Sequence, residues 1–154
     1  MVLYGDPKIY AHDEYGEVTV VITDSEPLYR ASDVIEIIFG EYKSELNIER
    51  VLGFFITANC KNPRPSSFCP RITIDCITES AVRYATMYAK APGGEKGEAA
   101  IEWLKHDVLD AVREEFYSPE AIFMRKYFSE ASDKEKFAVA GILNSLIALS
   151  KKRG

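Results

Sequence analysis

The sequence predicts an α+β fold with a small antiparallel or mixed sheet packed with helices, followed by a C-terminal pair of helices. Two observations predict this class. The expected elements follow one another as strand, strand, helix, loop, strand, helix, helix and then two further helices. The 154 residues are 47% hydrophobic and 12% aromatic, which is enough to build the core of one domain, or of a domain with an appendage.

Three segments have the composition of strands. "EVTVVIT" (17–23) is β-branched and apolar, and a short strand around "LYR" (28–30) follows after a turn, so the two predict a hairpin. "RITIDCI" (71–77) alternates between apolar and polar residues and predicts a third strand. Between them, "NCKNPRPSSFCP" (59–70) contains three prolines, and we expect a loop there because proline cannot donate to a sheet ladder.

The first helices are predicted from their caps. Ser32 is the expected N-cap of a short amphipathic helix that is closed by Gly40. A further helical turn is expected from Ser44. Thr78 is expected to cap a helix that runs to about Lys90.

The rest of the chain is predicted to be helical after a break. "APGGEKGE" (91–98) is expected to be a connector, and a helix follows at 100–116. Ser118 is the expected N-cap of the next helix, with Pro119 at its first position. A capping box beginning at Ser132 starts the last helix. This helix carries an apolar stripe made of Val139, Ile142, Leu143, Leu146 and Ile147.

The helix at 100–116 is apolar on more than one side. At about 100° per residue, its main stripe consists of Ala100, Ile101, Leu104, Val108, Ala111 and Val112. Trp103 and Leu109 project well to either side of this stripe. One packing partner cannot cover all three directions, so we expect the helix to be wedged between surfaces.

The sequence lacks a motif for catalysis or for a cofactor. His12 and His106 lie far apart and belong to no zinc motif, so we predict no metal site and place His106 on the polar side of its helix. Cys60, Cys69 and Cys76 have no C-x-x-C spacing and are expected to be small buried thiols rather than a disulfide framework or nucleophiles. We therefore predict no enzymatic activity and no cofactor; an enzyme is the weakest alternative.

The charge is unevenly spread along the chain. A net charge of −5 and a pI of about 5.2 argue against a surface that binds nucleic acid everywhere. Residues 60–96 nevertheless carry six basic and three acidic side chains, a local excess of +3. The candidate phosphate contacts in this stretch are Lys61, Arg64, Arg71, Lys90 and Lys96.

Three segments occur together in the order and spacing of one protein family. Residues 16–40 carry a strand, a turn ending in Glu-Pro, a strand with an aromatic residue and an Ala-x-Asp-Val helix. Residues 72–92 carry a strand followed by an Ile-x-Glu-Ser helix, and the helix at 100–116 has a tryptophan followed by Val-Leu and arginine. With these segments the chain resembles the BRO-N domain of phage antirepressors and baculovirus repeated-ORF proteins. The anchors of this resemblance are Glu26, Pro27, Asp33, Trp103, Leu109 and Arg113.

The resemblance implies how the chain is divided. We expect a BRO-N-like domain at 8–116 and a helical extension at 117–154. In such a domain Trp103 would fill a crease beside the helix at 79–90, and the last two helices would cover Leu109.

The resemblance also implies gene control in a phage or virus. We expect a regulator that binds DNA through the basic residues at 60–96. The alternative is a module that antagonises a repressor or a host factor without touching nucleic acid, which the acidic net charge favours. We further expect a homodimer joined through the C-terminal helices. No apolar run reaches 18 residues and the first ten residues lack the apolar region of a signal peptide, so we expect no membrane partner and the cytoplasm of the host cell.

Overall fold

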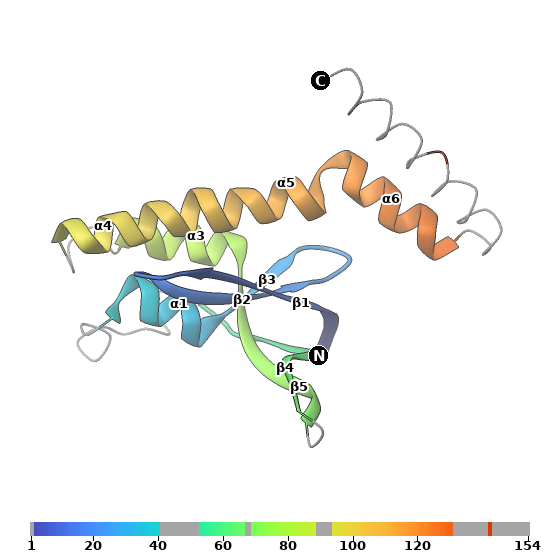
Figure 1. The fold of residues 1–154 in the computed structure, drawn as a ribbon, viewed down its shortest axis with the longest axis horizontal. Coiled ribbons are helices and arrows are strands. Elements are labelled where there is room, and N and C mark those ends of the chain that lie inside the picture. Colours follow the sequence, from blue (N-terminus) through green and yellow to red (C-terminus); the bar gives the residue numbers. More distant parts are fainter. Residues whose placement is uncertain (1, 41–52, 67–68, 89–93, 131–141, 143–154) are drawn as a thin grey trace. The chain divides into compact units, whose positions relative to one another are not determined.

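The computed structural model describes residues 2–40, 53–66, 69–88, 94–130 and 142 (Figure 1). The chain separates into two compact units, Met1–Glu115 and Phe116–Gly154. The first unit contains a mixed five-stranded sheet with helices, and the second contains helix, so the predicted α+β class is confirmed.

The five strands close into a small barrel in the order β1-β2-β3-β5-β4. Its strands are β1 (Val2–His12), β2 (Gly16–Ile22), β3 (Pro27–Arg30), β4 (Ile56–Ser66) and β5 (Cys69–Thr78). β1 pairs in parallel with β4, and the other neighbours are antiparallel. The predicted hairpin of β2 and β3 and the predicted strand at 71–77 are confirmed.

β1 was not predicted from the sequence. It starts at Val2, before the expected domain boundary at residue 8. It changes partner part-way: Gly5 pairs with Cys60 of β4, and Asp6 pairs with Ile22 of β2. A Cβ atom at Gly5 would lie 2.5 Å from the carbonyl oxygen of Ile22, so only glycine allows this crossing.

The predicted loop at 59–70 is wrong, because most of this stretch belongs to the paired strands β4 and β5. The ladder runs regularly as far as Lys61 opposite Arg71, and its register then shifts before Ser66. Two of the prolines, Pro63 and Pro65, lie in this irregular part, where no ladder hydrogen bond is required of them.

The barrel interior is filled by alternate residues of the strands. Its buried members are Val21, Leu28, Ala58, Cys60, Ile74 and Cys76. Successive side chains of a strand point to opposite faces, so the neighbours of these residues face outward. On β2 the outward residues Val18 and Val20 are fully buried, and the short helix α1 (Ala31–Ile38) contacts β2, β3 and β5.

The capping predictions have mixed outcomes. α1 begins at Ala31, and Ser32 is exposed in its first turn, so the predicted N-cap is wrong. Gly40 follows the last turn of α1 with a φ of +49°, the left-handed conformation that commonly ends a helix, so the predicted closing glycine is confirmed. Thr78 Oγ1 accepts a hydrogen bond of 3.2 Å from the backbone N–H of Ala81, which confirms the predicted cap.

The remaining helices include the long predicted one. They are α3 (Glu79–Tyr88), α4 (Gly94–Trp103), the π-helical segment η2 (Leu104–Asp110), α5 (Ala111–Tyr117) and α6 (Pro119–Glu130). α4 begins at Gly94, so the predicted break is wrong for residues 94–98. The predicted Ser118 cap of α6 is confirmed, since Ser118 Oγ accepts a hydrogen bond of 3.2 Å from the backbone N–H of Ala121. The turn from Ser44 and the capping box at Ser132 lie outside the described residues.

The π-helical segment explains the excess of apolar residues in this helix. In Figure 1, α4 and α5 form one continuous helix, and η2 is its middle part. Hydrogen bonds in a π-helix join residues i and i+5, which places Leu104 and Leu109 on one face. Both are fully buried. Within the described residues, none of the helices is long and apolar enough to span a bilayer.

Candidate nucleic-acid interface

β4 and β5 form a two-stranded ribbon with one polar face. Figure 1 shows this ribbon extending away from the long helix of α4 and α5. Inward residues of the ribbon, such as Ala58 and Ile74, belong to the barrel core. The outward face is built from three cross-strand pairs. These pairs are Thr57 with Asp75, Asn59 with Thr73, and Lys61 with Arg71.

Lys61 and Arg71 are directly opposite one another on this face. Both side chains are exposed, and across a sheet such partners lie about 4.5–5.5 Å apart at Cβ. Neither forms an ion pair in the part of the chain that the structure describes. Two of the five predicted basic residues are therefore brought together as free cations.

A hydrogen-bonded chain of side chains supports this pair. Arg71 Nε donates to Asn59 Oδ1 at 2.7 Å, and Asn59 Nδ2 donates to Thr73 Oγ1 at 3.2 Å. Asn59 and Thr73 were not predicted from the sequence. The alternation of "ITANCK" (56–61) could have placed Asn59 beside Lys61, had the prolines not suggested a loop.

The other three predicted basic residues are not brought to this face. Arg64 lies in the irregular part of β4 between Lys61 and Ser66, and its guanidinium is ion-paired with Glu17 of β2. Both groups are exposed, so the pair neutralises charge without adding much stability. Lys90 lies outside the described residues, as does the side chain of Lys96.

Four of the six sequence anchors have structural roles in the first unit. Asp33 Oδ2 accepts a hydrogen bond of 2.9 Å from the N–H of Thr19, which ties α1 to β2. Thr23 Oγ1 donates to the carbonyl oxygen of Glu26 at 2.6 Å in the turn before the buried Pro27. Leu109 is one of the fully buried residues.

Trp103 and Arg113 contact neighbours that the sequence did not indicate. The ring of Trp103 lies 5.7 Å from that of His12 and 6.1 Å from that of Tyr15, at the turn between β1 and β2. These aromatic contacts add the β1–β2 turn to the neighbours of Trp103, and the expected crease beside residues 79–90 stays a prediction. Arg113 forms an ion pair with the buried carboxylate of Glu79.

The chain was compared with models of protein families, with curated proteins and with solved structures, and none of the three comparisons finds a match. The functional proposal therefore depends on the residues of the ribbon and on the resemblance carried by the three sequence segments.

The cysteines differ in exposure. Cys60 and Cys76 are buried and free, whereas Cys69 is exposed, which corrects the expectation that all three are buried. Burial raises the pKa of Cys76 to about 12 and also raises that of Cys60. The two buried thiols therefore stay protonated near neutral pH and are poor nucleophiles.

The second histidine is on the surface, as predicted. His106 is exposed and lies between two carboxylates of its own helix, 2.9 Å from Glu102 and 3.2 Å from Asp110. The described residues include no cluster of three or more histidine, cysteine or acidic side chains arranged to hold a metal ion.

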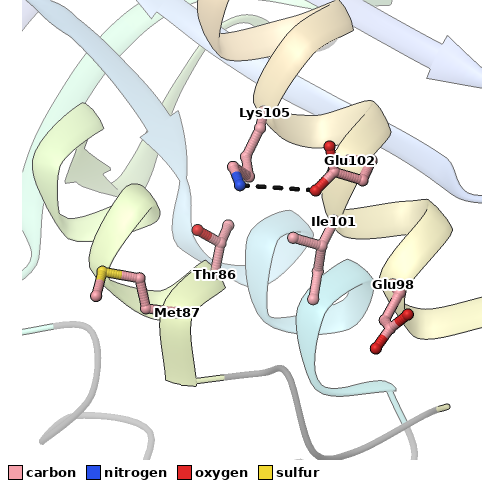
Figure 2. A pocket seen from close by; sticks show the side chains of 6 residues that line it. All are labelled: Thr86, Met87, Glu98, Ile101, Glu102 and Lys105. Atoms are coloured by element: carbon pink, nitrogen blue, oxygen red, sulfur yellow. Dashed lines mark ion pairs between the residues drawn. The ribbon is translucent and has the colours of Figure 1, made fainter. Parts of the chain in front are cut away.

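A hollow of about 400 Å³ lies between α3 and α4 (Figure 2). Six residues line it, namely Thr86, Met87, Glu98, Ile101, Glu102 and Lys105. Lys105 Nζ pairs with Glu102 at 3.6 Å, and the hydroxyl of Thr86 donates to the carbonyl oxygen of Arg83 at 2.6 Å. The Lys105 ammonium and the Thr86 hydroxyl are thus engaged with protein partners. These six residues provide no activated nucleophile.

Proposed function

We propose that this protein is a non-enzymatic regulator of the prophage-antirepressor type that contacts DNA through the β4–β5 ribbon. The observation that carries the proposal is a pair of exposed cations, Lys61 and Arg71, which face one another on the outward side of the ribbon and have no ion-pair partner among the described residues. The major groove of B-DNA admits a two-stranded β-ribbon. The resemblance to the BRO-N family supports the same function.

The acidic net charge does not oppose this proposal, because many carboxylates lie on the long helix, whereas the outward face of the ribbon carries Lys61 and Arg71 against one carboxylate, Asp75. Carboxylates line the long helix, where Glu98, Glu102, Asp107, Asp110 and Glu114 are all exposed. The cations at the ribbon lie on another element, and Figure 1 shows the ribbon directed away from that helix. An approaching duplex would be attracted at the ribbon and repelled at the helix, which fixes the orientation of binding.

The experiment is to measure the affinity of the full chain for a random duplex at ~50 mM and ~200 mM salt. We expect binding that weakens with salt, since each neutralised phosphate releases counterions. The variant Lys61→Glu with Arg71→Glu should lose this binding while keeping the circular dichroism spectrum of the parent. A matched control reverses Lys105 and Lys126 instead and should change the affinity little.

Two outcomes would contradict the proposal. If the parent does not bind duplex at the lower salt concentration, the chain does not act on DNA by itself. If the ribbon variant binds like the parent, the interface lies on another surface.

A second candidate function is protein binding, and α6 carries the observation that favours it. Ile122 and Phe123 are 46% and 65% exposed, and the Phe123 ring lies 6.3 Å from that of Tyr127. Exposed apolar side chains that gather on one helix are typical of partner surfaces. A repressor, a host regulatory protein or a second copy of the chain would be the partner. Failure of DNA binding together with capture of such a partner would favour this function.

A further inference from the structure

We infer that Arg71 reads guanine in the major groove and that Asn59 is the residue that positions it. This inference rests on the proposed function and goes beyond it, because it assigns sequence preference to one side chain. Its starting point is the 2.7 Å hydrogen bond from Arg71 Nε to Asn59 Oδ1.

The hydrogen bond selects which edge of the guanidinium is available. A guanidinium has five N–H donors in a planar fork, and the Nε–H of Arg71 is already used. The remaining end carries Nη1 and Nη2, which form no hydrogen bond or ion pair within the residues that the structure describes. Two parallel donors are thus left for a partner with two adjacent acceptors.

Asn59 is itself held by a hydrogen bond, so Arg71 is positioned by two successive hydrogen bonds rather than by one. Asn59 Nδ2 donates to Thr73 Oγ1 at 3.2 Å, across from β4 to β5. This second hydrogen bond determines which end of the amide faces Arg71, because Nδ2 is engaged and Oδ1 remains as the acceptor. Ordering the side chain before binding lowers the entropy cost of the complex.

Guanine offers the matching pair of acceptors. Its O6 and N7 lie side by side in the major groove, and a bidentate arginine on them is the commonest specific contact between protein and DNA. A phosphate also has two acceptor oxygens, but Lys61 stands directly opposite as a flexible point charge suited to that role. We therefore assign the base to Arg71 and the backbone to Lys61.

The test uses two duplexes of the same G·C-rich sequence, one of which has 7-deazaguanine in place of guanine. This base lacks the N7 acceptor but keeps the pairing and every phosphate. The full chain should bind the normal duplex at least about fivefold more tightly, as expected for a base contact. Arg71→Ala removes both donors, so it should bind both duplexes equally, and more weakly than the parent binds the normal duplex.

Two further variants separate positioning from charge. Asn59→Ala should reduce the preference for the normal duplex while leaving the affinity for the deaza duplex unchanged. Lys61→Ala should weaken binding to both duplexes by the same factor and lower the salt slope by about one phosphate, with the preference intact. Circular dichroism of each variant checks that the barrel is folded.

The outcomes distinguish this inference from the proposed function. If the parent binds both duplexes equally and with a salt dependence, DNA binding stands and Arg71 contacts phosphate, which overturns the inference. A preference that survives Arg71→Ala overturns it as well. If neither duplex binds at low salt, both the proposed function and the inference fail.

Discussion

The carboxylate of Glu79, at the start of α3, is ion-paired with Arg113 of α5, a residue 34 positions further along the chain. The Glu79 side chain is only 10% exposed, and Arg83 approaches its other oxygen at 3.5 Å. Arg83 in turn pairs with Asp110 at 2.8 Å. Glu79 is thus a buried anion whose cationic partners connect α3 to the long helix.

Glu79→Gln should lower the free energy of unfolding by about 1.5–3 kcal/mol, the range for hydrogen bonds to charged groups. The substitution keeps the shape of the side chain but leaves two guanidinium groups without their shared anion. Urea denaturation followed by circular dichroism measures the effect. Glu114→Gln, at an exposed site next to Arg113 on α5, is the control and should change stability by less than about 0.5 kcal/mol. Equal effects of the two variants would show that the buried carboxylate is not structurally important.

Thiol reactivity should separate the three cysteines. At about pH 8 the folded chain should react with a disulfide reagent at one site, the exposed Cys69, and Cys69→Ser should abolish this fast phase. Cys60 and Cys76 should react only after denaturation, because burial raises the pKa of both. Fast reaction of two or three thiols in the native chain would contradict the closed barrel interior.

The pKa of Cys76 also predicts how stability depends on pH. Its folded pKa is about 12, against an ordinary value of 9.0, so above pH 9 the unfolded chain releases a proton that the folded chain retains. The stability contribution is present below pH 9 and is lost as pH rises towards 12. Urea curves should therefore show a smaller loss of stability for Cys76→Ala than for the parent between pH 9 and about pH 11. Parallel losses would contradict the assigned pKa.

Trp103 should be a structural residue. It is only 8% exposed and contacts the rings of His12 and Tyr15, so Trp103→Ala should cost roughly 3–5 kcal/mol. Thermal or urea unfolding followed by circular dichroism measures this, with Trp103→Phe as a milder control that keeps a ring. Tyr15→Ala should cost less, since Tyr15 is half-buried. If Trp103→Ala unfolds as the parent does, the ring does not stabilise the β1–β2 turn.

The regular parts of this fold could be predicted from the sequence because local pattern and tertiary role agree there. "EVTVVIT" and "RITIDCI" are β-branched and lie in strands with buried faces. β1 was missed because Gly5, Asp6 and Pro7 interrupt its pattern, although Gly5 is the residue that lets the strand cross from β4 to β2. The π-helical turn was missed because a spacing of 100° per residue assumes an α-helix throughout.

The candidate site was predictable only in part, for a similar reason. Charge alone selected Lys61 and Arg71, but it also selected Arg64, which the structure pairs with Glu17. The roles of Asn59 and Thr73 depend on the register of two strands, and that register follows from the closed barrel rather than from any local motif.

The last prediction is that the chain is a homodimer joined through its C-terminal helices. The expected apolar stripe of the last helix lies outside the described residues except for Ile142, which is 61% exposed. On α6, Ile122 and Phe123 add further exposed apolar surface. A two-fold contact allows each copy to bury this surface against the same surface of its partner, since an isologous interface is self-complementary.

Light scattering of the intact chain at tens of micromolar tests the dimer. Leu143→Asp with Leu146→Asp should give a monomer, because burying two carboxylates in an apolar interface has a large free-energy cost of desolvation. Phe123→Asp tests whether α6 takes part, and Glu120→Gln, a change at an exposed position on the same helix, is its control. A monomeric intact chain would refute the prediction. A dimer that survives both the double leucine variant and Phe123→Asp would place the interface in the first unit.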